Sequence, residues 1–300
     1  MPNIFDDYAP YRPFLDSGQF THCIHGALEL LKSIKEMSEA QFRTAHKGTP
    51  FYVMGFAAFA SHDYSAASLF FDAAVEEDLT NFPGRPDSPA LLFMQLDASV
   101  DNQLAHQIVV QVSDNLIALI RDYNGRANAQ ALTLNDLRVF FLRPIIRSQQ
   151  RQQRALATAL ISFVAEWPYR RRLISVMEHG SREPFFLHLF RGCLLFESLL
   201  KAQTKKALTE TTLGNILRRD VRGELALTNP DVQETDFNTI IAGLSANMGM
   251  EDTINSAGKA RNTLGHNIVW PTANLNTTTY DLLVKNIAAA CIHVISKLYR

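Results

Sequence analysis

The chain has few cysteines and no long uncharged apolar run, and both shortages restrict what it can be. Its cysteines, Cys23, Cys193 and Cys291, are far apart, and none belongs to a CxxC pair. Three cysteines at such spacing argue against a disulfide framework and fit a reducing, cytoplasmic compartment. The least polar stretch, residues 51–71, carries Asp63 at its middle, where a membrane span tolerates charge least. We therefore expect a soluble chain, with this stretch folded as two buried helices joined by a turn.

Signals for targeting and for several enzyme classes are also missing. The first residues, Met1 to Asp7, are acidic and lack the basic start and apolar run of a secretory signal. Without a GxxxxGKS/T, GxGxxG, HExxH or GxSxG motif, nothing supports a nucleoside triphosphatase, dinucleotide enzyme, zinc protease or α/β-hydrolase. His22 and His25 lack a second ligand pair at any familiar spacing, so we predict neither a metal nor a cofactor.

The composition is that of an ordinary folded protein with room for two domains. The 300 residues are 47% hydrophobic, with 19 phenylalanines, and the formal net charge is −1. That length suffices for two domains, each with its own core. The near-neutral charge excludes a globally basic nucleic-acid binder but allows a local basic patch.

Helical spacing of apolar residues recurs along the whole chain, and no segment alternates apolar and polar residues over a useful length. We therefore predict an all-α fold. A triple arginine at 170–172, Gly180 and Pro184 mark the boundary that we predict between an N-terminal helical domain (1–180) and a C-terminal helical bundle (181–300). Trp167-Pro168 is expected to end the helix before that boundary.

The segment from Phe51 to Ala74 resembles one tetratricopeptide repeat. Gly55 would let two helices approach closely, and His62-Asp63-Tyr64 would make the turn between them. The inner face of the second helix would be filled by Ala67, Phe71 and Ala74. Leu79 stands where the family's proline is common. A single hairpin cannot bury its own face, so we expect it within a repeat-like N-terminal domain that selects a partner, a substrate or a regulatory ligand.

The stretch with the most chemistry lies near the C-terminus. Arg261, Asn262 and His266 combine a phosphate-binding cation, a polar amide and an imidazole that titrates near neutral pH. Asn262 and His266 are i, i+4 and share a helix face. Arg261 and His266 lie about 140° apart on a regular helix. We therefore expect either that Gly265 distorts the last turn or that two copies of the motif face each other across a dimer axis.

Arg-Asn-x-x-x-His late in a helical unit resembles the signature of the HEPN superfamily. The resemblance covers roughly 184–300 and includes a long preceding helix with Glu197, since many members carry an acidic or polar residue there. It implies metal-independent RNA cleavage by a homodimer with paired motifs at the interface. It also implies a cellular role in defence or stress response.

Carried onto this chain, the resemblance implies catalytic roles for Arg261, Asn262, His266 and Glu197. His266 would act as general base or acid on the ribose 2′-hydroxyl or the leaving 5′-oxygen. Arg261 would bind the scissile phosphate, and Asn262 would orient either of these two side chains. Glu197 would hold Arg261 in place. The products would carry 2′,3′-cyclic phosphate and 5′-hydroxyl ends, and no metal is needed because the nucleophile lies inside the substrate.

Other interpretations of the same residues stay open. Arg261 alternatively pairs with Glu197 or Glu251 for structural reasons alone, and His266 satisfies a carbonyl at a helix C-terminus. HEPN domains without activity also exist, as scaffolds or as partners of nucleotidyltransferases. The alternative function is therefore a dimerising adaptor that binds a protein partner through its repeat-like half. His188 and His293 are single histidines that we expect to be satisfied core or surface residues.

Basic residues outside the motif are candidates for contacts with an RNA backbone. They are Lys201, Lys259, Arg147, Arg151 and Arg154. The last three fall at i, i+4 and i+7, so one helix would present them on a single face, and the arginines at 170–172 add to it. Alternatively, these arginines form an ordinary solvent-exposed helix face near Asp136 and Glu166 and bind no RNA.

Overall fold

The computed structural model describes residues 12–82, 84–85, 87–100, 103–127, 131–177, 179–204, 212–266 and 275–300. These residues form helices, turns and loops and contain no β-strand, which confirms the predicted all-α fold. Among these ranges, none of the helices combines the length and the apolarity that crossing a bilayer requires. The three cysteines are buried and form no disulfide.

Two compact units make up the chain, and each is described by itself. The first comprises Met1–Gln111 and Ile145–Ser162, and the second comprises Val112–Pro144 and Phe163–Arg300. The division falls within three helices, α8 (Gln103–Ala127), α10 (Arg143–Ile146) and α11 (Arg151–Val176). The boundary predicted at residue 180 thus lies inside the second unit.

The expectation that Trp167-Pro168 ends a helix is wrong, because Pro168 lies inside α11. An interior proline costs a helix about 3 kcal/mol or more, so other contacts have to offset it. Trp167 supplies one such contact: its side chain is buried, and its indole Nε1 donates to Asp281 Oδ1 at 2.9 Å.

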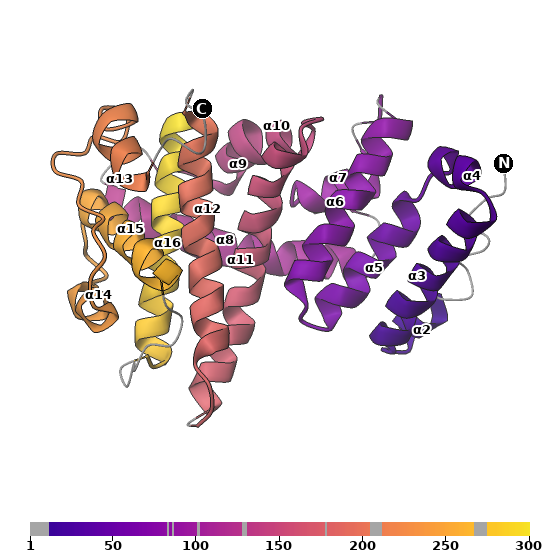
Figure 1. Cartoon of the computed structure of the whole chain (residues 1–300), viewed down its shortest axis with the longest axis horizontal. Coiled ribbons are helices and arrows are strands. Elements are labelled where there is room, and N and C mark those ends of the chain that lie inside the picture. Colours follow the sequence, from indigo (N-terminus) through magenta and orange to yellow (C-terminus); the bar gives the residue numbers. More distant parts are fainter. Residues whose placement is uncertain are drawn as a thin grey trace. The chain divides into compact units, whose positions relative to one another are not determined.

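The first unit contains the expected helical hairpin (Figure 1). Its helices are α2 (Arg12–Asp16), α3 (Phe20–Met37), α4 (Glu39–Thr44), α5 (Gly48–Ala60), α6 (Tyr64–Asn81) and α7 (Pro89–Met94), with parts of α8, α10 and α11. Asp63 caps α6 by accepting from Ala66 N at 3.0 Å. A Cβ at Gly55 would lie 2.6 Å from the Phe71 ring, so glycine permits the close approach of α5 to α6. Kinship with tetratricopeptide repeats stays a prediction.

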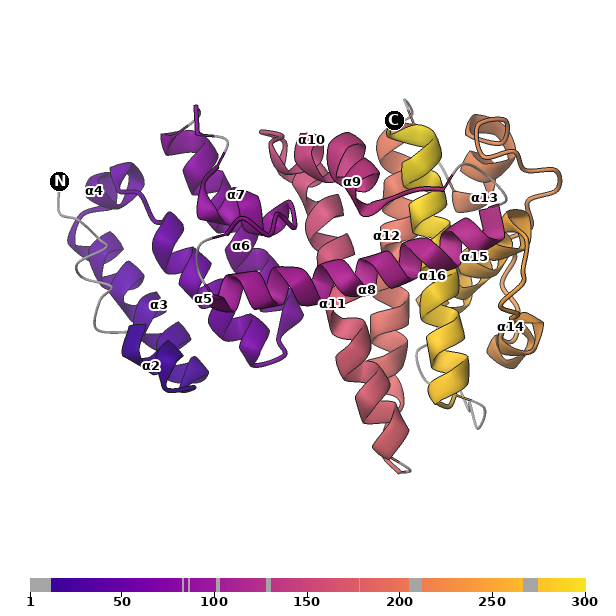
Figure 2. The same cartoon turned by 180° about the vertical axis from the view of Figure 1, so that it is seen from behind.

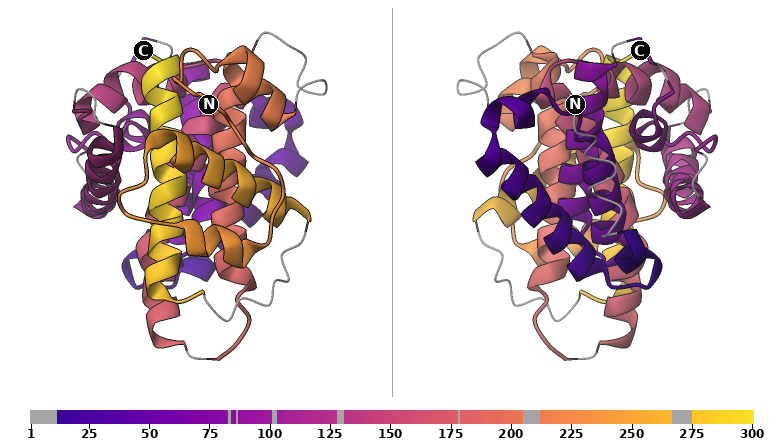
Figure 3. Two further views of the ribbon diagram at one scale, coloured as in Figure 1. Left: turned by 90° about the vertical axis from the view of Figure 1, so that its left-hand side faces the viewer. Right: turned by 90° about the vertical axis from the view of Figure 1, so that its right-hand side faces the viewer.

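The second unit is built around α16. Its elements, besides parts of α8, α10 and α11, are α9 (Leu134–Leu137), the π-helical turn η2 (Arg138–Leu142), α12 (Glu183–Gln203), α13 (Leu213–Asn215), the π-helical turn η3 (Ile216–Asp220), α14 (Phe237–Gly243), α15 (Met250–His266) and α16 (Thr277–Leu298). α12 and α16 run side by side in the same direction, and α15 crosses them obliquely (Figures 1 and 3). The end of α8 passes across α16 on another side (Figure 2).

Several buried polar groups of this core are paired and fix how its helices pack. On α8, Arg126 donates to Asp122, to Thr253 Oγ1 on α15 and to Asn286 Oδ1 on α16. His188 on α12 lies between the Phe163 carbonyl and the Tyr280 hydroxyl, at 3.0 and 2.7 Å. Burial lowers the pKa of His188 to about 4. The ring is therefore neutral near pH 7, with Nε2–H donating and Nδ1 accepting.

Candidate functional site

An open cavity of about 620 Å³ in the second unit contains the side chains of the Arg-Asn-x-x-x-His motif. We call it the Arg261 cavity. Its charged and polar lining residues are Glu197, Lys201, Thr212, Arg218, Gln233, Glu234, Arg261, Asn262 and His266. The cavity thus brings together the four residues chosen from the sequence as catalytic and one of the predicted RNA-binding lysines.

The described residues hold the Arg261 guanidinium along one edge and leave its other edge open. Its Nε donates to Glu197 Oε2 at 2.5 Å, and its Nη1 donates to Asn262 Oδ1 at 3.2 Å. Its Nη2 makes no hydrogen bond to the described part of the chain. The guanidinium leans towards the helix end, since Nη1 lies 3.7 Å from where a Cβ of Gly265 would be. A fixed guanidinium with an uncommitted edge suits binding of a phosphate oxygen.

Asn262 orients Arg261. Its Nδ2 donates to the Val232 carbonyl at 2.5 Å, so its Oδ1 is turned towards the Arg261 guanidinium. The sequence allowed Asn262 to orient either Arg261 or His266, and the contacts join it to Arg261.

Glu197 ties two cations to the cavity wall. This residue of α12 is only 5% exposed and accepts from Arg261 on one oxygen and from Lys201 Nζ, at 2.7 Å, on the other. Two cations on one carboxylate leave the trio with one surplus positive charge. Glu251, the other carboxylate considered for Arg261, instead accepts from the backbone N–H groups of Thr228 and Asn229.

His266 stands at the rim of the cavity. Its side chain is 66% exposed, and its Nε2 lies 3.8 Å from Glu234 Oε2, which is an ion pair only when the imidazole is protonated. α15 remains α-helical through Gly265, so the predicted distortion of the last turn is absent. Arg261 and His266 share the cavity without a contact between them.

The loop that faces α15 is positioned by side chains of that helix. Asn255 Oδ1 accepts from Asp231 N at 2.9 Å, and Thr263 bonds both the N–H and the carbonyl of Thr235. Together with the Asn262–Val232 bond, these contacts set an irregular segment in place without secondary structure of its own. Lining residues that the sequence did not single out, Gln233 and Glu234, come from this loop.

Arg218 is a further cation of the cavity that the sequence did not single out. It lies on η3 and donates from Nε to the Pro230 carbonyl at 3.3 Å. The only sequence signal for it is the basic pair Arg218-Arg219, which no periodicity connects to the motif.

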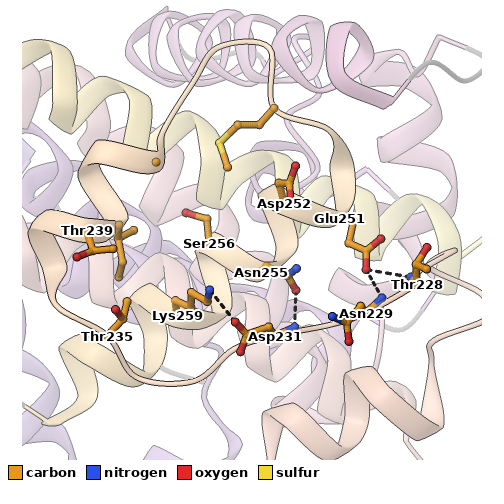
Figure 4. A pocket seen from close by; sticks show the side chains of 13 residues that line it. Thr228, Asn229, Asp231, Thr235, Thr239, Glu251, Asp252, Asn255, Ser256 and Lys259 are labelled. Atoms are coloured by element: carbon orange, nitrogen blue, oxygen red, sulfur yellow. Dashed lines mark hydrogen bonds and ion pairs between the residues drawn. The ribbon is translucent and has the colours of Figure 1, made fainter.

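Lys259 lines a different pocket, of about 540 Å³, together with Asp231 and Thr235 of the same loop (Figure 4). Its Nζ pairs with Asp231 Oδ2 at 2.8 Å, and the hydrogen bond from Lys259 lowers the pKa of Asp231. Lys259 therefore does not line the Arg261 cavity.

The predicted basic helix face is not formed. Arg147 lies in a turn after α10, whereas Arg151 and Arg154 belong to α11, which starts at Arg151. Arg154 is 1% exposed and donates to Asp72, to Glu76 and to the Ser148 carbonyl. Its guanidinium is thus a structural link of the first unit and out of reach of an RNA phosphate. Arg151 is 75% exposed and forms a forked ion pair with Glu76.

Comparison with known proteins identifies no relative of this chain. No family model matches the chain, and no curated protein or solved structure matches it either. In the ranges that the structure describes, no cluster of three or more His, Cys, Asp or Glu side chains is arranged to hold a metal ion. Function has to be inferred from the chain's own residues.

Proposed function

We propose that the chain is a metal-independent endoribonuclease whose active site is the Arg261 cavity. One observation carries the proposal: a guanidinium fixed by Glu197 and Asn262, a lysine and an exposed imidazole line one open cavity. These are the groups that phosphodiester cleavage through the ribose 2′-hydroxyl requires.

In the proposed reaction, the imidazole of His266 accepts the proton of the ribose 2′-hydroxyl. The 2′-oxygen attacks phosphorus, the bond from phosphorus to the 5′-oxygen breaks, and a proton is delivered to that oxygen. Arg261 Nη2 binds a non-bridging oxygen and stabilises the charge that develops on it. Lys201 adds a second cation, and Glu197 holds both cations in position. The products carry 2′,3′-cyclic phosphate and 5′-hydroxyl ends.

The proposal includes a homodimer. One group has to take the 2′-hydroxyl proton while another protonates the leaving oxygen. Among the described residues, His266 is the one histidine that lines the cavity, and it lies exposed at the rim. A second copy of the motif facing the first would supply the second imidazole.

The first unit would select a partner, a substrate or a regulatory ligand. The competing function is a non-catalytic adaptor that dimerises through the second unit and binds a protein through the first. An ion pair between Arg261 and Glu197 is compatible with both, so activity has to decide between them.

The test is RNA cleavage in EDTA by the wild-type chain and by Arg261→Ala and His266→Ala. Loss of the imidazole is expected to slow cleavage by about 10²–10⁴-fold, the usual contribution of general acid–base catalysis. His25→Ala removes an exposed histidine of α3, and Arg43→Ala removes an arginine paired with Glu39 on α4; both are expected to cleave like the wild type. Wild-type rates in His266→Ala would refute the assignment. A folded wild type that cleaves no RNA would favour the adaptor.

A further inference from the structure

A second cavity of the second unit, of about 590 Å³, has no residue in common with the Arg261 cavity. We call it the Asp281 pocket. It is lined by Asn115 of α8, by Trp167, Pro168, Arg171, Arg172 and Ser175 of α11, and by Asp281 and Lys285 of α16. Three cations and a single carboxylate therefore meet at this cavity.

The carboxylate of Asp281 is fully engaged by groups of the pocket wall. Its Oδ1 accepts from Trp167 Nε1 at 2.9 Å and lies 3.2 Å from Arg171 Nε, and its Oδ2 lies 2.8 Å from Lys285 Nζ. Both oxygens thus have charged or indole donors, and the side chain is only 16% exposed. Asp281 serves to position the two cations and has little capacity left to accept from a ligand.

The pocket contains more hydrogen-bond donors than the carboxylate of Asp281 engages. Arg171 contacts Asp281 through Nε, and its side chain is 56% exposed. Arg172 is exposed and forms no ion pair with any described residue. The Asn115 Nδ2 atom is buried and has no hydrogen-bond partner among the residues that the structure describes. Ser175 donates its hydroxyl proton to the Arg172 carbonyl at 2.7 Å.

We propose that the Asp281 pocket binds a phosphate group. A cavity that offers many N–H donors, a net positive charge and few unused acceptors is complementary to an oxyanion with several acceptor oxygens. Guanidinium groups match the geometry of phosphate oxygens. The partly buried carboxylate of Asp281 contacts Arg171 and Lys285 and so positions both cations for the ligand. The cavity volume of about 590 Å³ is in the range of small-ligand sites.

Two sources supply this chemistry, a phosphodiester of an RNA strand and the terminal phosphate of a nucleotide. The proposal does not depend on RNA cleavage, because no residue of the Arg261 cavity takes part. Binding is therefore measured in Arg261→Ala protein, in which the guanidinium of the other cavity is absent.

The experiment is calorimetric titration at low salt with four probes: AMP, inorganic phosphate, adenosine and a 2′-O-methyl RNA trinucleotide without terminal phosphates. Arg172→Gln and Lys285→Gln, each added to Arg261→Ala, are expected to weaken phosphate-dependent binding by about tenfold or more, since each removes a charged hydrogen-bond donor. Arg43→Gln and Lys297→Gln, exposed cations outside the pocket, are the matched controls and are expected to leave affinity unchanged.

Binding of AMP or phosphate without binding of the trinucleotide identifies a phosphate monoester as the ligand, whereas binding of the trinucleotide identifies an RNA backbone. Either result supports the proposed phosphate site if Arg172→Gln and Lys285→Gln weaken that binding. Equal affinity in the pocket variants and the controls would overturn the proposal. So would binding of adenosine as tight as that of AMP, or no binding of any phosphate probe. Thermal unfolding of each variant distinguishes lost binding from a lost fold.

Discussion

At the scale of single residues, the surroundings of each imidazole decide whether it can exchange protons. His188 and His293 are buried, each lies between a backbone carbonyl and a tyrosine hydroxyl, and burial lowers the pKa of both to about 4. They stay neutral at physiological pH, as expected of satisfied core residues. His266, by contrast, is exposed at a cavity that also holds Arg261 and Lys201.

The buried histidines predict acid destabilisation. In the unfolded chain a histidine has a pKa of about 6.5, so between pH 6.5 and 4 the unfolded state binds more protons and the free energy of unfolding falls as pH falls. From pH 7 to pH 5 the expected loss is about 2 kcal/mol for each of His188 and His293. Urea unfolding at both pH values measures it.

The matched variant is His188→Gln, which removes one titrating ring. Its free energy of unfolding is expected to fall less between pH 7 and pH 5 than that of the wild type. A pH dependence identical to that of the wild type would mean that folding does not lower the pKa of His188.

Some residues of the candidate site could be predicted from the sequence, whereas contacts between residues far apart in the chain could not. Arg261, Asn262 and His266 lie close in sequence, and Glu197 was chosen by resemblance; all four line one cavity. Arg154 was predicted to contact RNA because of its spacing from Arg147 and Arg151 on a helix. Its partners Asp72 and Glu76 lie 82 and 78 positions earlier, and local periodicity carries no information about contacts over such separations.

At the scale of elements, the packing of α15 against the loop before α14 shapes the Arg261 cavity. A Cβ at Gly258 would collide with the Val232 side chain and lie 2.9 Å from its Cβ. Glycine therefore lets Val232 approach α15 closely enough for its carbonyl to accept from Asn262, which in turn orients Arg261.

Gly258→Ala is expected to push Val232 away from α15. Overpacking of this kind typically costs about 1–3 kcal/mol, and displacement of the Val232 carbonyl is expected to lower RNA cleavage as well. Thermal unfolding and cleavage rates measure the two effects.

Gly265→Ala on the same helix is the control for stability, since the nearest atom to its Cβ would lie 3.6 Å away. Its stability is expected to be unchanged or slightly raised, because alanine favours a helix over glycine. Equal stability of the two variants would show that Val232 moves without cost.

Helix ends in the second unit were predictable where local chemistry sets them. Pro184 lies in the first turn of α12, and Asp236 caps α14 through its side chain. The break between α10 and α11 and the passage of α11 through Pro168 were not predictable. Both depend on tertiary contacts, such as the bond from Arg154 to the Ser148 carbonyl and the bond from Trp167 to Asp281.

At the scale of the whole molecule, the proposed reaction needs two chains. Each chain contributes one Arg261 cavity with one described histidine, His266, so a pair of facing motifs would provide both proton-transfer groups. We expect light scattering to give twice the mass of one chain under conditions in which RNA is cleaved. A monomer that cleaves RNA at the same rate per chain would show that a single cavity suffices.

The central claim is that RNA bound in the Arg261 cavity is cleaved by attack of the RNA's own 2′-hydroxyl. The chemical ends of the products test this claim most directly. Mass spectrometry of RNA incubated with the wild-type chain in EDTA is expected to find 2′,3′-cyclic phosphate and 5′-hydroxyl ends. The same strand with 2′-O-methyl riboses is expected to stay intact, and so is RNA incubated with His266→Ala. Cleavage of the methylated strand, or products with 3′-hydroxyl and 5′-phosphate ends, would contradict the account.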